Sequence, residues 1–175
     1  MYLKYKYATS AFSLVEVLLV LVILVLLAKQ TWTSKLASLF SRTDYEQLVL
    51  SQHSLARGLT LARQFAVQAK QAVSLCGGHH LDSSCDGSWS SGWYIQSDAG
   101  IKTYHLFPSD ISVRWSGFPT NKKQIDFYET GHSGYQNGTF YLCQYGLMAR
   151  IVLNQSGRFY LMDIISLSEL DEGCE

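Results

Sequence analysis

The first 70 residues contain two helical patterns of apolar positions. Residues 12–28, "FSLVEVLLVLVILVLLA", are apolar on every side except for Ser13 and Glu16. From residue 34 to 70 there is no proline and a single glycine. Apolar side chains recur there in steps of three and four, which is the spacing of one helix face. We therefore predict one long helix from Phe12 to about Lys70, with any interruption near residues 29–32. Its second half would bury a single stripe: Leu36, Leu39, Phe40, Leu48, Leu55, Leu59, Ala62, Phe65, Ala66 and Ala69.

The remaining sequence has the pattern of short β-strands. Runs rich in β-branched and aromatic residues alternate with turn sequences such as "DGSWSSG", "ETGHSG" and "NQSG". A helix followed by many short strands predicts an α+β fold, in which the amphipathic helix packs on an antiparallel β-sheet. The eight predicted strands are residues 72–76, 92–96, 102–107, 111–115, 124–128, 139–143, 149–154 and 157–164.

The apolar segment at residues 12–28 is compatible with a membrane span. It lies at the lower limit of the roughly 17–25 residues that a spanning helix needs. Lys4 and Lys6 precede it, so the positive-inside rule predicts a cytoplasmic N-terminus and places the rest of the chain outside.

A single acid stands near the start of this apolar segment. A carboxylate within hydrocarbon costs about 2.5–3.5 kcal/mol on insertion scales and usually has a partner. Small residues suited to signal cleavage are missing after the segment, but Ala11 precedes it. Cleavage between Ala11 and Phe12 would leave a positive α-amino group on Phe12, four residues from Glu16. Glu16 would then pair with that amine or with the amine of a neighbouring subunit; alternatively, it snorkels to the membrane edge.

The stretch "AFSLVE" followed by an apolar helix resembles the signal of type IV pilins and type II secretion pseudopilins. The resemblance implies that a prepilin peptidase cuts after Ala11 and methylates Phe12, and that Glu16 guides docking into a growing filament. Two positions depart from the family. Glycine is usual at the place of Ala11, and many members have proline where this chain has Thr33.

Later landmarks are similar to the GspH/FimT-type minor pilins and pseudopilins, namely "LTLARQFAVQAKQAVSLC", "GWYIQ" and "NQSGRFYL". This implies a type IV pilin-like fold with a leader at 1–11, a transmembrane half-helix at 12–32 and a periplasmic globular domain at 33–175. The protein would be a single-pass inner-membrane protein of a bacterium before it enters a pilus or pseudopilus, near its tip. The implied partners are other pilins or pseudopilins, the prepilin peptidase and the inner-membrane assembly platform.

The charge balance bears on nucleic acid. The formal net charge is zero, and loss of Lys4 and Lys6 with the leader would leave fewer basic than acidic residues. DNA affinity depends mainly on phosphate neutralisation by Lys and Arg. Some minor pilins of the subgroup capture DNA through a late G-R-x-R motif. This chain reads "GRFY", so Arg158 matches and Tyr160 replaces the second arginine. A DNA receptor is therefore the alternative function, with Arg158, Lys122 and Lys123 as the residues to test.

Four cysteines favour disulfides in an exported chain: Cys76, Cys85, Cys143 and Cys174. A local bridge between Cys76 and Cys85 would leave the other two to tie down the C-terminal tail, but four cysteines allow three pairings. The rival is zinc bound by Cys76, Cys85, His79 and His80. Adjacent histidines rarely converge on one tetrahedral ion, so we expect neither a metal nor another cofactor.

The sequence lacks the common catalytic motifs. It contains no G-x-S-x-G elbow, H-E-x-x-H helix or glycine-rich phosphate loop. His105 and His132 fall in a predicted strand and a predicted loop. We therefore expect a structural protein rather than an enzyme. A singly anchored periplasmic enzyme is the third hypothesis.

Overall fold

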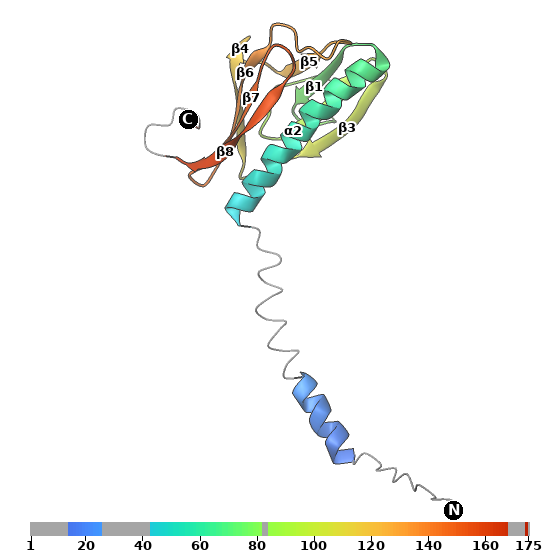
Figure 1. Ribbon diagram of the computed structural model, residues 1–175, viewed down its shortest axis with the longest axis vertical. Helices are drawn as coiled ribbons and strands as arrows, with labels where there is room; N and C mark the ends of the chain where they lie inside the picture. The colour runs from blue at the N-terminus through green and yellow to red at the C-terminus, as the bar shows by residue number, and fades with distance from the viewer. Residues whose placement is uncertain (1–13, 26–42, 82–83, 168–173, 175) are drawn as a thin grey trace, which may run out of the picture. The chain divides into compact units, whose positions relative to one another are not determined.

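A computed structural model describes residues 14–25, 43–81, 84–167 and 174 (Figure 1). The chain divides into two compact units, Met1–Arg42 and Thr43–Glu175, which we describe separately. The expected leader, Ala11, Phe12 and residues 26–32 of the expected transmembrane segment lie outside the described residues. Within the first unit, residues 14–25 are helical and their side chains are exposed. No helix in the described part of the chain reaches the length and hydropathy expected of a membrane span.

The second unit begins with α2, Asp44–Ala69. Thr43 caps its N-terminus: the residue has extended backbone angles, and its Oγ1 accepts a hydrogen bond from the Glu46 N–H at 3.3 Å. A helix continuous through residue 43, as the apolar pattern predicted, is therefore not what the structure shows. Lys70 adopts the left-handed conformation and ends the helix where the sequence predicted.

Within residues 70–81, 84–167 and 174, eight strands follow α2, as predicted, but they form two antiparallel sheets rather than one (Figure 1). β4 pairs with β6 instead of with either of its neighbours in sequence, so the chain leaves the first sheet for β4 and returns to it for β5. The first sheet has the order β3-β2-β1-β5, with β1 at Val73–Gly77, β2 at Gly92–Ser97, β3 at Gly100–Leu106 and β5 at Gln124–Phe127. The second has the order β4-β6-β7-β8, with β4 at Ser112–Phe118, β6 at Asn137–Gln144, β7 at Leu147–Leu153 and β8 at Phe159–Ser166.

The apolar stripe of α2 packs on both sheets. The helix contacts β1, β2 and β5 of the first sheet and β6, β7 and β8 of the second, and Figure 1 shows it lying across the strands. Gly58 permits the closest approach, because a Cβ at this position would lie 3.0 Å from the indole of Trp93. One helix therefore closes the core of both sheets, which buries Leu48, Leu55, Leu59, Ala62 and Ala66 completely.

Candidate functional site

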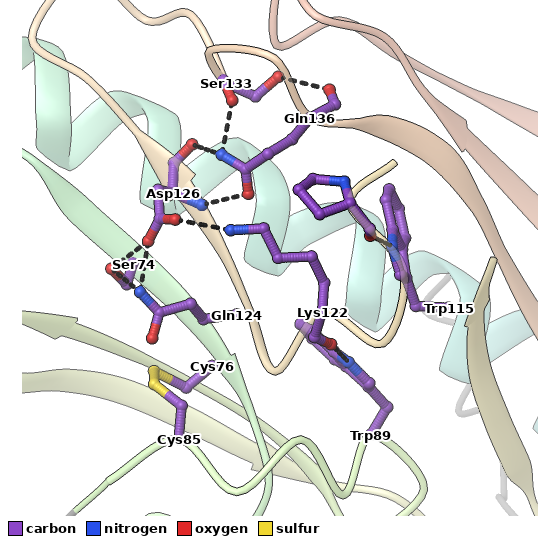
Figure 2. A network of polar contacts seen from close by, with 11 residues as sticks. Ser74, Cys76, Cys85, Trp89, Trp115, Lys122, Gln124, Asp126, Ser133 and Gln136 are labelled. Atoms are coloured by element: carbon purple, nitrogen blue, oxygen red, sulfur yellow. Dashed lines mark hydrogen bonds and ion pairs between the residues drawn. A yellow bond between two sulfur atoms is a disulfide. The ribbon is translucent and has the colours of Figure 1, made fainter. Parts of the chain in front are cut away.

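The free edge of β5 faces the seam between the two sheets. The Gly77 N–H donates to the carbonyl of Lys123, the residue just before β5. Because only every second residue of an antiparallel strand bonds to a given neighbour, Ile125 and Phe127 bond to β1. The N–H and carbonyl of Asp126 therefore point away from β1. The side-chain amide of Gln136 bonds both of those groups: Oε1 accepts from the Asp126 N–H and Nε2 donates to the Asp126 carbonyl, each at 3.1 Å (Figure 2). The amide of Gln136 thus takes the place of a neighbouring strand.

The free edge of β4 is closed in the same way. Ser90 Oγ accepts from the Val113 N–H at 2.8 Å and donates to the Val113 carbonyl at 3.3 Å. Two buried indoles hold the connecting loops: Trp89 donates to the Lys122 carbonyl and Trp115 to the Pro119 carbonyl (Figure 2). Such capping keeps an edge from pairing with another chain.

The Asp126 carboxylate gathers a polar cluster at this seam. It accepts hydrogen bonds from Ser74 at 2.8 Å, from Gln124 at 2.6 Å and from the Lys122 ammonium at 3.1 Å (Figure 2). The Lys122 side chain is only 21% exposed in this ion pair. The cluster therefore neutralises Lys122 within the domain and removes it from the set of free cations.

The three residues expected to contact DNA differ in exposure and pairing. Lys123 is exposed just before β5, whereas Arg158 is exposed in the turn that precedes β8. Lys122 is paired with Asp126, which leaves Lys123 and Arg158 as the exposed cations of the three.

All four cysteines form disulfides. Cys76 bonds to Cys85, with Cα atoms 5.1 Å apart, and ties β1 to the loop that follows it (Figure 2). Cys143 bonds to Cys174, with Cα atoms 5.9 Å apart, and ties the C-terminus to β6. The zinc alternative thereby loses both of its thiolate ligands. His79 and His80 stack instead, and the His80 ring lies 3.6 Å from the ring of Tyr104.

The two histidines considered as catalytic bases lie apart. His105 is on β3, where its ring stacks near Trp93 and meets Phe107 edge-on. Partial burial against these rings lowers the pKa of His105 below its ordinary value. His132 is exposed in the loop between β5 and β6. Each occupies the kind of element that the sequence predicted for it.

With this geometry established, the chain can be compared with known proteins. The family model for the type II transport protein GspH matches residues 51–157, from the first half of α2 to the turn before β8. The chain belongs to the GspH family. Crystal structures of the type IV minor pilin FimU from Pseudomonas aeruginosa strain PAO1 share its fold. One matches with a TM-score of 0.54 and 21% identity over 69% of this chain and 92% of FimU. A second crystal form gives 0.50 and 21% over 65% and 90%. None of the curated proteins compared with the chain matches it significantly.

In this GspH-family protein, Glu16 lies in the helical residues 14–25. Its carboxylate is exposed among exposed leucine and valine side chains, including Leu14, Val17 and Leu19. The acid is therefore flanked by apolar side chains within this helical stretch.

Sequence reasoning missed the residues that close the strand edges. Gln136 and Ser90 lie in turn-rich stretches, "SGYQNG" and "SWSSG", where polar residues are ordinary. Sequence reasoning also missed Gln52, whose buried amide donates to the carbonyls of Arg150 and Met162 at 3.0 and 2.9 Å, where β7 and β8 shift register. Of these residues, only Gln52 could have been found from the sequence, because it is a polar residue within the apolar stripe of α2.

Proposed function

We propose that this GspH-family protein is a minor pilin or pseudopilin, a structural subunit of a type IV pilus or of a type II secretion pseudopilus. The observation that carries the proposal is the family match over residues 51–157 behind the signal "AFSLVE". Prepilin peptidase cuts between Ala11 and Phe12 and methylates Phe12. The mature chain resides in the bacterial inner membrane with its globular domain in the periplasm. It is then incorporated into the filament near the tip of the filament.

Glu16 guides the docking step. In the membrane its carboxylate is expensive to keep without a counter-charge. The α-amino group of Phe12 on an adjacent subunit supplies that charge once the leader is gone. Assembly therefore satisfies a cation and an anion at the same time, which favours addition of the subunit over its remaining in lipid.

The globular domain supplies the contacts with sibling subunits and has no catalytic role. Its two disulfides suit the oxidising periplasm. DNA binding is the alternative function. Of the residues that it would use, Lys122 is paired with Asp126, whereas Lys123 and Arg158 are exposed. We therefore place the structural role ahead of it.

Substitution of Glu16 tests the proposal. A Glu16→Ala chain should still be cleaved after Ala11. It should also form both disulfides, because these lie in the second unit. It should nevertheless be absent from purified filaments. Glu129→Ala, which removes an exposed carboxylate from the loop after β5, is the matched control and should enter filaments normally. Undiminished incorporation of Glu16→Ala would contradict the docking role.

A further inference from the structure

The outer edge of β8 offers unpaired backbone groups. The Asn154 N–H donates to the Arg158 carbonyl at 2.9 Å. Since every second residue of β8 bonds to β7, this bond shows which residues of β8 face β7 and which face outward. Residues 158, 160 and 162 direct their backbone groups toward β7. Phe159 and Leu161 direct theirs outward, and neither has a hydrogen-bond partner there in the part of the chain that the structure describes.

This edge differs from the other strand edges of the domain. Side chains close β4 and β5, as Ser90 and Gln136 show. The outer strand of the first sheet, β3, carries an exposed lysine, Lys102, which is a common guard against strand pairing. The segment Phe159–Met162 lies between two exposed charged residues, Arg158 and Asp163, but itself has no charge and no side-chain cap from the described residues. Tyr160, Met162 and Leu161 are 56%, 42% and 38% exposed.

The open segment has defined ends. At its far end the register of β7 and β8 shifts, and the amide of Gln52 binds the carbonyls of Arg150 and Met162 at this irregularity. At its near end stands Arg158, whose own N–H donates to the Asn154 side chain. The regular free edge is thus the four residues Phe159–Met162, preceded by one exposed guanidinium.

Charge indicates what chemistry the edge accepts. Arg158, Tyr160 and Met162 are two residues apart in sequence, so their side chains project from one face of the sheet. A strand added beside β8 would form an ion pair with Arg158 if it carried a carboxylate at the position opposite that residue. A second copy of β8 does not supply one within the regular edge: in the antiparallel registers that pair Phe159 with Phe159 or Leu161 of the copy, Arg158 faces Tyr160 or Met162. Asp163, the carboxylate of β8, lies beyond these positions, at the register shift. A different subunit is the better fit.

We propose that the edge Phe159–Met162 binds an extended strand of a different pilin-like subunit, with apolar side chains opposite Tyr160 and Met162 and a carboxylate opposite Arg158. The added strand extends the second sheet by main-chain hydrogen bonds. This inference rests on the proposed function and names the partner surface of the globular domain. The edge lies beyond residues 51–157, which the family model matches.

The test is photo-crosslinking in filaments of the native bacterium. The full-length chain carries p-benzoylphenylalanine in place of Tyr160, and mass spectrometry identifies the adduct. Leu161→Pro, added to this chain, removes an outward N–H and none of the hydrogen bonds to β7, so the domain's own ladder keeps its bonds. Leu106→Pro makes the same change at an outward position of β3 and is the matched control. Arg158→Glu is a second variant, which leaves the backbone unchanged.

We expect crosslinks from position 160 to a different pilin-like subunit. Leu161→Pro and Arg158→Glu should each lower the yield about tenfold, equivalent to about 1.4 kcal/mol of binding free energy. Leu106→Pro should leave the yield unchanged. The strand-addition proposal is wrong if the chain enters filaments but position 160 crosslinks to nothing or only to a second copy. It is also wrong if both variants crosslink as well as the chain without Leu161→Pro or Arg158→Glu. In each of these cases the proposed function stands. Absence of the unsubstituted chain from filaments would overturn both.

Discussion

The side-chain amide of Gln136 bonds the N–H and the carbonyl of Asp126, as a neighbouring strand would (Figure 2). The same Gln136 donates to the Ser133 carbonyl, and Ser133 Oγ reaches the Asn154 carbonyl at 2.9 Å. Through these bonds the edge of the first sheet is held to the turn between β7 and β8. The seam between the sheets is therefore joined by polar side chains as well as by the apolar contacts of α2.

Removal of the Gln136 amide should weaken this seam. Gln136 is 5% exposed, and Gln136→Ala would leave the two backbone groups of Asp126 without their partners. We expect the free energy of unfolding of the domain Thr43–Glu175 to fall by about 1–3 kcal/mol, the usual cost of unsatisfied buried polar groups. Urea denaturation measures the change. Gln155→Ala, at an exposed turn position, should have almost no effect. Equal stability of both variants would show that the amide does not hold the seam.

Gly58→Ala should destabilise the domain although alanine favours helices by about 1 kcal/mol over glycine. The new Cβ would lie 3.0 Å from the Trp93 ring and 3.2 Å from a Leu75 methyl carbon. Overpacking of this kind typically costs about 1–3 kcal/mol. Thermal unfolding of the two single variants and of Gly58→Ala with Trp93→Leu gives the coupling. In the double variant, leucine at position 93 should reduce the loss of stability caused by Gly58→Ala. If the stability losses of the two single variants simply add, the Trp93 indole is not what excludes a side chain at position 58.

Loss of either disulfide should lower stability by about 2–4 kcal/mol, and loss of the longer loop should cost more. Cys76–Cys85 spans 9 positions and Cys143–Cys174 spans 31, so the chain-entropy model predicts a difference of about 1 kcal/mol. Paired Cys→Ala variants compared by urea denaturation measure both values. A larger loss from the shorter loop would show that local packing around Cys76, rather than chain entropy, dominates.

His105 should make stability depend on pH. Burial lowers its pKa in the folded state, so the unfolded state binds more protons at pH values between that lowered pKa and about 6.5. Stability should therefore rise with pH across this window and level off above it. His105→Phe should remove this contribution, whereas His53→Gln, on the exposed face of α2, should retain it. Identical pH profiles for the native domain and His105→Phe would contradict the assignment.

The sequence predicted the local elements better than their connections. The β-rich runs locate all eight strands because alternating residues and glycine-rich turns act over a few positions. The two-sheet arrangement was missed because β4 pairs with β6, and no short pattern states which runs pair. The helix start at Thr43 could have been found from Thr43 and Glu46, a capping pair that the strong apolar repeat obscured. The pairing of Lys122 with Asp126, four residues apart, appeared only in three dimensions.

Mass spectrometry of the mature N-terminus tests the central claim most directly. Trypsin should release an N-terminal peptide that begins with methylated Phe12, contains Glu16 and ends at Lys29. That result would establish both the cut after Ala11 and the free amine that the docking step requires. A mature chain that still begins at Met1, or that begins after Ala28, would contradict the account, because Glu16 would then lack either its counter-charge or its place in the protein.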